Sequence, residues 1–247
     1  MKKIYLVMYA LGMVMTPFTM ASGSESHWGY TGHNGPQNWG SLNPAYGLCS
    51  TGKNQSPIDV TASVDSRLPA IKFSYAGFGK EILNNGHTVQ VNFSEGNQIE
   101  LDGVIFKLKQ LHFHTPSENH IKGKSYPLEM HLVHASKDGQ LAVVAVMFEQ
   151  GQVNTALDKA WSQLPIHNGD IHMLTASLSA NELLPKARDY YRFNGSLTTP
   201  PCSEGVRWLV MKDAIKISRA QVETFAEVIH GTNNRPLQKR VARIVMH

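Results

Sequence analysis

Two histidines separated by one residue are the first feature of this sequence that could support chemistry. His112 and His114 end the stretch 108–114, in which polar and apolar side chains alternate from Gln110 onward. In a β-strand, side chains two residues apart project from the same face and lie about 7 Å apart along the strand. The two imidazoles could therefore converge on one metal ion, while Leu111 and Phe113 occupy the opposite face.

A second stretch that we read as a strand, residues 128–134, follows within 20 residues of the first. As a strand, it would place Glu129, His131 and Val133 on one face and His134 on the other. A third histidine from a neighbouring strand would leave the fourth tetrahedral position open, which is typical of catalytic rather than structural zinc sites. Spacing alone does not choose among His120, His131 and His134 as that third ligand.

Two polar residues favour metal binding over the alternative, in which these are ordinary hydrogen-bonded strand histidines. Gln110 precedes His112 by two positions, and Glu129 precedes His131 by two positions. A metal-bound imidazole needs an acceptor for its other ring N–H, and a side chain on the same strand face can supply it. We therefore expect Gln110 and Glu129 to orient these two rings.

The elements that must position these residues are mostly strands. Between about residues 71 and 148, short β-type runs are separated by turn pairs, namely Asn85-Gly86, Glu95-Gly96, Asp102-Gly103 and Asp138-Gly139. Helices are few: Asn154 can cap a helix over 155–164, and Ser218 with Gln221 forms a capping-box pattern. Residues 24–58 show no sustained period and are predicted to be ordered but irregular. We expect a mainly β (α+β) fold, a single domain on a large, mostly antiparallel, twisted central sheet with a few short peripheral helices.

The charge balance argues against a polyanionic partner. The 247 residues include 23 Lys and Arg and 19 Asp and Glu, for a formal charge of +4. Two of the lysines lie in a segment that we expect to be removed, which leaves 21 − 19 = +2. No run of five basic residues occurs, so we expect a small-molecule substrate, no nucleic acid and no membrane partner after processing.

The first 21 residues have the organisation of a secretory signal peptide. Lys2 and Lys3 precede an apolar run over 4–15, and small residues lead up to Ala21, after which we expect cleavage. The predicted mature domain is 22–247. Export exposes it to an oxidising compartment, so its only two cysteines, Cys49 and Cys202, are predicted to form one disulfide.

Several motifs together resemble one known family, the α-class carbonic anhydrases, which are zinc lyases that interconvert carbon dioxide and bicarbonate. The resemblance spans about residues 27–243, and Thr115-Pro116 is similar to its bacterial branch. The motifs are His27-Trp28-Gly29-Tyr30, Asn54-Gln55-Ser56-Pro57-Ile58, Leu83-Asn84-Asn85-Gly86-His87, Gln110-Leu111-His112-Phe113-His114, Ser117-Glu118-Asn119-His120, Glu129-Met130-His131-Leu132-Val133-His134, Gly195-Ser196-Leu197-Thr198-Thr199-Pro200-Pro201-Cys202 and Asn233-Asn234-Arg235-Pro236.

The resemblance implies a zinc cofactor and a role for each matching residue. The zinc ligands would be His112, His114 and His131, and their outer partners Gln110, the Asn233 carbonyl and Glu129. Thr198 would be the hydroxyl gatekeeper, held by Glu118. The resemblance further implies an apolar wall for carbon dioxide made of Val133, Val143, Leu197 and Trp208, with Thr199 at the cavity floor. His87 would be the proton shuttle, and Tyr30, Asn85 and Gln90 would hold its water molecules. Cys49 and Cys202 match the disulfide of exported members.

Two departures from the family pattern and two rival functions stay open at this point. Thr115-Pro116 stands where animal members have Trp-Gly, and Lys239-Arg240 follows Gln238 directly where the family usually has a Pro-Leu-Asn stretch. The rivals are a zinc esterase or hydrolase, and a non-catalytic binding module on the same scaffold. The signal segment and the two cysteines predict a periplasmic or secreted location, and a homodimer is compatible with these expectations.

Overall fold

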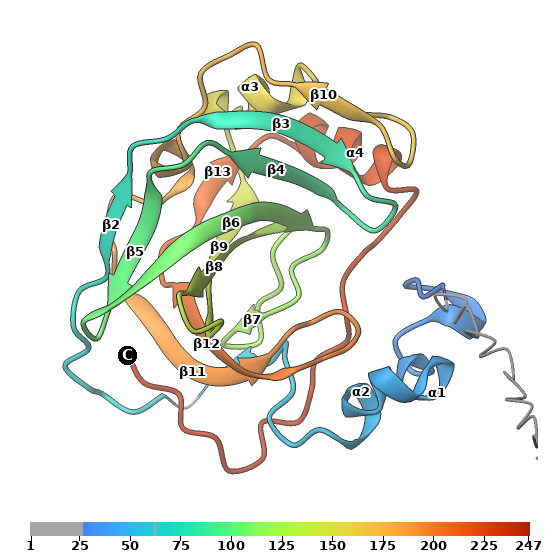
Figure 1. Ribbon diagram of the computed structural model, residues 1–247, viewed down its shortest axis with the longest axis vertical. Helices are drawn as coiled ribbons and strands as arrows, with labels where there is room; N and C mark the ends of the chain where they lie inside the picture. The colour runs from blue at the N-terminus through green and yellow to red at the C-terminus, as the bar shows by residue number, and fades with distance from the viewer. Residues whose placement is uncertain (1–26, 62) are drawn as a thin grey trace, which may run out of the picture.

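The computed structural model describes residues 27–61 and 63–247 (Figure 1). The predicted signal peptide, residues 1–21, therefore lies outside the described residues. Within the described part of the chain, no helix is long and apolar enough to cross a membrane.

A large mixed sheet of 11 strands dominates the structure. Its main path runs in the order β10-β3-β4-β6-β8-β9-β12-β11, with β5 and β2 continuing from β6 and β13 adding to β9. The strands are β2 (Lys72–Tyr75), β3 (Gly79–Asn84), β4 (Val89–Phe93), β5 (Asn97–Leu101), β6 (Val104–His114), β8 (Leu128–Ser136), β9 (Leu141–Gln150), β10 (Ile171–Met173), β11 (Tyr190–Ser196), β12 (Glu204–Met211) and β13 (Ile215–Ile217). Within this sheet of described strands, β12 and β13 alone pair in parallel, both with β9, so the expected mostly antiparallel sheet is confirmed.

Short helices and one small parallel pair complete the fold. The pair is β1 (Asp59–Val60) with β7 (His120–Ile121). The helices are η1 (Gly32–Asn34), α1 (Trp39–Leu42), η2 (Pro44–Tyr46), α2 (Leu48–Thr51), α3 (Thr155–Trp161), η3 (Ala180–Leu183) and α4 (Arg219–Val228). The segment expected to be irregular thus contains four short helical turns, none longer than four residues.

The two predicted helices differ in how well the sequence located them. At α4, Ser218 and Gln221 form the predicted reciprocal capping box. At α3, Asn154 caps the first turn as predicted, but the helix ends at Trp161 rather than Leu164. The next backbone bonds run from residue i to i−3 and tighten the chain into a turn. Pro165 follows, which disfavours helical conformation at the residue before it.

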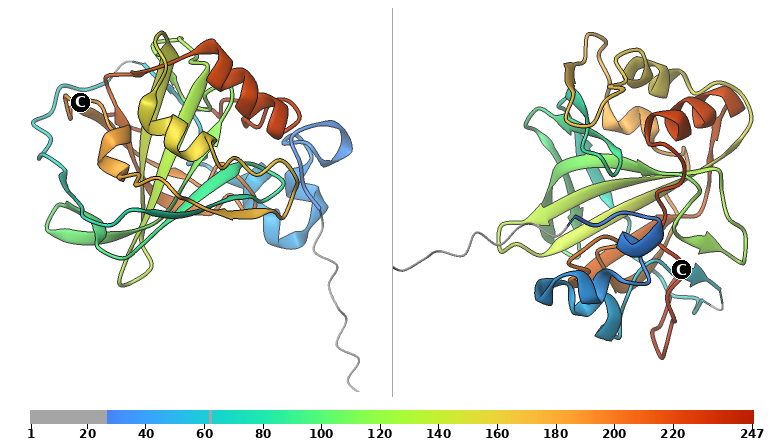
Figure 2. Two further views of the ribbon diagram at one scale, coloured as in Figure 1. Left: turned by 90° about the horizontal axis from the view of Figure 1, so that it is seen from above. Right: turned by 90° about the vertical axis from the view of Figure 1, so that its right-hand side faces the viewer.

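The sheet has apolar side chains on both faces, and helices cover one of them. Leu111 and Phe113 of β6 belong to a core that includes Leu157 of α3 and Phe225 of α4. Figures 1 and 2 show α3 and α4 on this side, whereas α1 and α2 lie at the other end of the molecule. Because strand side chains alternate, His112 and His114 project from the opposite face, where the site is built.

The N-terminal helical turns are fixed to the sheet by a disulfide and a buried tryptophan. Cys49 on α2 bonds Cys202, with Cα atoms 5.0 Å apart, which confirms the predicted pairing. Trp39 is fully buried in the same cluster, and its indole N–H donates to the carbonyl oxygens of Gly29 and Asn34.

Candidate metal centre and cavity

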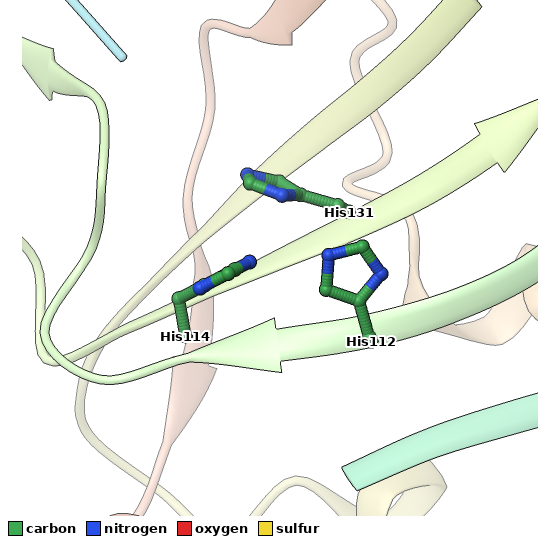
Figure 3. Close-up of side chains that lie close together, drawn as sticks. All are labelled: His112, His114 and His131. Atoms are coloured by element: carbon green, nitrogen blue, oxygen red, sulfur yellow. The ribbon is translucent and has the colours of Figure 1, made fainter. Parts of the chain in front are cut away.

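Strand register brings the third histidine to the other two. On the antiparallel pair β6–β8, His112 and His131 are direct Cα partners, so both side chains leave the same face of the sheet. His114 lies two residues further along β6, and its ring centroid is 4.6 Å from that of His131. Figure 3 shows the three rings around one common space. One ring nitrogen of each histidine lies within 4.8 Å of the corresponding nitrogens of the others.

Each ring uses its remaining nitrogen for a hydrogen bond at the periphery. His112 Nδ1 donates to Gln110 Oε1 over 2.8 Å, and His131 Nε2 donates to Glu129 Oε1 over 2.9 Å. His114 Nδ1 donates to the Asn233 carbonyl oxygen over 2.7 Å. These acceptors leave His112 Nε2, His114 Nε2 and His131 Nδ1 as the nitrogens that face the common space, with their lone pairs available.

The donor set fits a zinc ion. Burial lowers the pKa of all three imidazoles, well below the usual value for His112 and His131, so the rings are neutral as metal ligands must be. His114 Nε2 is buried and finds no hydrogen-bond partner among the described residues. An unpartnered buried imidazole nitrogen is costly unless an ion or water fills the space beside it. Three neutral nitrogens with one open position match a catalytic zinc site.

Glu129 is held by more groups than the sequence indicated. Its Oε2 accepts the backbone N–H groups of Glu118 and Asn119 over 2.7 and 2.8 Å. Its Oε1 accepts the Asn119 amide over 2.8 Å in addition to the His131 ring. Asn119 itself accepts from the Ile58 backbone N–H. The carboxylate that orients His131 is therefore fixed on every side, and Asn119 is a member of the site that sequence reasoning missed.

Glu118 lies beside the metal ligands, completely buried. Its Oε2 is 3.5 Å from His114 Nε2, and its Oε1 accepts the Arg235 backbone N–H over 2.9 Å. Burial raises the pKa of the Glu118 carboxyl well above its usual range, while hydrogen bonds from Arg235 and from the Thr198 hydroxyl act in the opposite direction. Thr198 therefore lies close enough to influence this carboxyl, while Glu118 Oε2 finds no hydrogen-bond partner among the described residues.

Backbone bonds fix the loop that carries Thr198. The Leu197 N–H donates to the Ser203 carbonyl, and the Cys202 N–H donates to the Thr199 carbonyl. The Trp208 indole N–H donates to the Ser196 carbonyl over 3.0 Å. These bonds tie the loop to β12 and to the disulfide.

The expected apolar wall forms one row across three strands. Val133 of β8 pairs with Val143 of β9, and Val143 pairs with Trp208 of β12. The metal row, which joins His112, His131 and Ala145, lies two residues along the same strands, or about 7 Å away. Leu197 is half-buried and packs against the same apolar cluster.

A cavity of about 120 Å³ opens above the histidines. Ten residues line it, including the predicted floor residue Thr199 and all four residues of the predicted proton path: Trp28, Tyr30, Asn85, His87, Thr88, Gln90, Gln110, His112, His114 and Thr199. The His87 ring stacks on the Trp28 indole with ring centroids 3.7 Å apart and planes 6° from parallel. Partial burial lowers the pKa of His87, and the nearby His27 lowers it further.

The remaining candidate ligands are placed away from the metal space. His134 projects from the opposite face of β8, where it is completely buried and lies 2.8 Å from the Tyr75 hydroxyl. His120 lies on β7, outside the group of three.

Three contributors to the site lack a local sequence signal: Trp28, Asn119 and Arg235. Trp28 and Arg235 act on residues distant in the chain, as with the 117 positions between Arg235 and Glu118, whereas Asn119 acts on Glu129 from the turn before its strand. Their motifs were noted in the sequence, but no period or spacing indicated which atoms they would contact.

The comparisons with known proteins agree with this geometry. The sequence model of the family described as eukaryotic-type carbonic anhydrase matches residues 34–247. A carbonic anhydrase of Neisseria gonorrhoeae is 48% identical over 236 residues, covering 95% of this chain and 93% of that protein. One from Pectobacterium atrosepticum is 44% identical over 240 residues, covering 97% and 98%.

Solved structures show the same fold. The α-carbonic anhydrase of Thermovibrio ammonificans, in complex with the inhibitor sulfanilamide, superimposes with a TM-score of 0.89 at 46% identity. The match covers 91% of this chain and 100% of that one. With a family match over most of its length, close bacterial relatives and the three-histidine site, this chain belongs to the α-class, or eukaryotic-type, carbonic anhydrases.

Proposed function

We propose that His112, His114 and His131 hold one zinc ion and that the surrounding residues divide the work of carbon dioxide hydration. The observation that carries this proposal is the set of three neutral ring nitrogens facing one space, each ring fixed by its own acceptor. When bound, zinc would supply a nucleophile near neutral pH, because it lowers the pKa of a coordinated water molecule. That pKa is about 7 in carbonic anhydrases.

The row of Val133, Val143 and Trp208, with Leu197 beside it, binds carbon dioxide. The substrate is apolar and uncharged, so a dry apolar surface suffices and a charged clamp is unnecessary. This row lies about 7 Å from the metal row along the strands. The wall can therefore hold the substrate carbon next to the reacting centre. Thr199, at the floor of the cavity, closes the polar side.

Thr198 and Glu118 orient the nucleophile. A hydroxyl whose proton is committed to a carboxylate can only accept a hydrogen bond from the attacking group. Thr198 therefore selects the deprotonated nucleophile and aims its lone pair at carbon dioxide. The Arg235 backbone N–H keeps the Glu118 carboxylate in place for this task.

His87 carries the product proton from the cavity to solvent. Its ring lines the cavity, and an imidazole titrates close enough to neutral pH to load and unload protons during turnover. Tyr30, Asn85 and Gln90 line the same cavity and would hold the water molecules that bridge the gap to the metal.

The chain works outside the cytoplasm, as a mature domain of residues 22–247 in the periplasm or as a secreted protein. The Cys49–Cys202 disulfide supports this, because such bonds persist in oxidising compartments. The signal organisation of residues 1–21 supports it independently.

Zinc removal tests the central proposal. Metal analysis of the purified mature chain should give about one zinc per molecule, chelation should abolish carbon dioxide hydration, and added zinc should restore it. A chelated chain that still hydrates carbon dioxide would contradict the proposal. Ester hydrolysis measured in the same samples separates the rivals: an esterase would lose ester turnover on chelation without having hydrated carbon dioxide, and a binding module would show neither activity.

A further inference from the structure

The irregular chain that follows α4 touches the site at two points. At the first, the Asn233 carbonyl accepts from His114 Nδ1, and at the second, the Arg235 backbone N–H donates to Glu118 Oε1. Asn233 and Arg235 are each only 2% exposed. Segment 233–235 therefore orients one metal ligand and the carboxylate that holds the Thr198 proton.

This segment belongs to no helix or strand, and it is held by one backbone bond, from the Asn233 N–H to the Thr115 carbonyl over 3.1 Å, and by side chains. At one end, the Asn233 side chain accepts from the Thr115 N–H over 2.8 Å and donates to the Phe113 carbonyl over 2.9 Å. At the other end, the next residue is Pro236, which has no backbone N–H to offer. Beyond it, the Gln238 N–H donates to the Pro57 carbonyl over 2.8 Å, so the Arg235 side chain shares the anchorage at that end with this backbone bond.

The Arg235 guanidinium makes three hydrogen bonds to the N-terminal part of the chain. Nη1 donates to Gln55 Oε1 over 2.9 Å and to the Ser56 carbonyl over 2.8 Å, and Nη2 donates to the Cys49 carbonyl over 2.9 Å. The guanidinium carbon also lies 5.6 Å from the centre of the Trp39 ring. The planar fork of donors thus fixes the residue at several angles at once.

A buried cation with neutral acceptors is an expensive way to fill space. Burial lowers the pKa of the Arg235 guanidinium to about 10, with the negative charge of Glu118 acting in the opposite direction. An apolar side chain of similar volume would avoid that cost, but it would leave Gln55 Oε1 and the Ser56 and Cys49 carbonyls without this donor. The guanidinium therefore does more than fill space: its hydrogen bonds fix the position of the backbone.

We propose that Arg235 is a positioning residue, whose guanidinium fixes segment 233–235 and thereby sets both the orientation of His114 and the place of Glu118. This inference rests on the zinc site proposed above. It predicts two linked losses when the guanidinium is removed: weaker zinc binding, because the His114 acceptor moves, and slower chemistry, because Glu118 holds Thr198 less firmly.

The test compares Arg235→Met and Arg235→Lys with the wild type. Zinc dissociation constants are measured by competition with a chelator, and kcat and KM for carbon dioxide are measured at saturating zinc. Loss of outer partners weakens metal binding by about 10- to 100-fold in known sites. We expect about a 10-fold higher dissociation constant and about a 10-fold lower kcat/KM for Arg235→Met, with Arg235→Lys between it and the wild type.

Arg192→Met is the matched control. Arg192 forms a bidentate pair with Asp102, away from the metal centre, so its loss costs stability but should leave zinc affinity and turnover within about two-fold of wild type. A merely structural Arg235 would behave in the same way, with a lower free energy of unfolding but unchanged zinc affinity in the folded fraction. That result overturns the inference.

Two further outcomes are decisive. If Arg235→Met does not fold, Arg235→Lys and Gln55→Leu carry the test, and unchanged zinc affinity in both overturns the inference. A wild-type chain that binds no zinc overturns the zinc site itself and this inference with it. A wild type that binds zinc beside unaffected variants overturns the inference alone.

Discussion

His131 stands directly opposite His112 across the β6–β8 ladder, with ring centroids 5.2 Å apart. Direct partners on antiparallel strands have Cβ atoms about 5 Å apart, close enough for two imidazoles to share an ion. His114 completes the set from the same face of β6.

His131→Ala should therefore abolish most activity. The substitution removes one of three nitrogen ligands and leaves Glu129 buried without its ring partner. Zinc affinity and carbon dioxide hydration should both fall by at least about 100-fold, the second on the scale of single-group losses in preorganised sites. His134→Gln is the control, because His134 lies on the other face of the strand. A His131→Ala chain with one zinc and full activity would show that the ligand is another residue.

Thr198→Ala should slow catalysis without removing the metal. The substitution removes the hydroxyl that we propose donates to Glu118 and accepts from the nucleophile. We expect kcat/KM to fall by roughly 10²-fold with zinc still bound. Parallel measurement of zinc content makes the result specific. An active Thr198→Ala enzyme would refute the gatekeeper role.

His87→Ala should lower kcat and spare kcat/KM. The second quantity ends with bicarbonate release, before the proton leaves the cavity. We expect a roughly 10-fold loss of kcat in weak buffer and substantial recovery when imidazole is added, because a small base replaces the missing ring. His172→Ala, an exposed histidine on β10, is the control. Absence of rescue would place the shuttle elsewhere.

The Cys49–Cys202 disulfide should stabilise the fold strongly. It joins residues 153 positions apart, and the chain-entropy treatment gives up to about 5 kcal/mol for a loop of that size. Thiol titration of denatured, unreduced protein should detect no free thiol. The Cys49→Ser/Cys202→Ser double variant should unfold at a lower urea concentration, with its free energy of unfolding reduced by up to about 5 kcal/mol. Two reactive thiols in the wild type would exclude the bond.

His134 should make the protein acid-sensitive. Burial lowers its pKa from 6.5 to about 4, so below pH 6.5 the unfolded chain binds a proton that the folded chain does not. Its contribution to stability is therefore present at neutral pH and lost as the pH falls. Between pH 7 and 5 the loss is about 2 kcal/mol.

The measurement for His134 is urea unfolding of the zinc-free protein at both pH values. His134→Gln keeps a polar partner for the Tyr75 hydroxyl but has no group that titrates in this range. The pH-dependent loss of stability should be about 2 kcal/mol smaller in this variant than in the wild type. An equal loss in the two proteins would mean that His134 is not the source.

Local sequence rules predicted the parts of the site that lie on one strand. The period of two placed His112 and His114 together and put Gln110 and Glu129 beside their rings, because these relations depend only on extended backbone. The same rules left His120, His131 and His134 as alternatives for the third ligand. That choice depends on which strands pair and in which register, and only the resemblance to the family indicated His131 before the structure was known.

Contacts between distant parts of the chain were beyond such rules. The Asn233 carbonyl reaches His114 across 119 positions, and the Arg235 side chain reaches Cys49 across 186. No periodicity connects residues so far apart, since their meeting depends on the path of the whole chain. The end of α3 was misjudged for a local reason, a tightened last turn before Pro165.

The arrangement of segment 233–235 has a consequence for the order of folding. The three zinc ligands lie on adjacent strands close in sequence, whereas the acceptor for His114 and the donor for Glu118 come from the last 15 residues. Contacts of long sequence separation form slowly, because the closure entropy of a large loop precedes any gain. We therefore expect the histidines to meet before their supports dock, and the rate at which tight zinc binding appears during refolding should report the docking of segment 233–235.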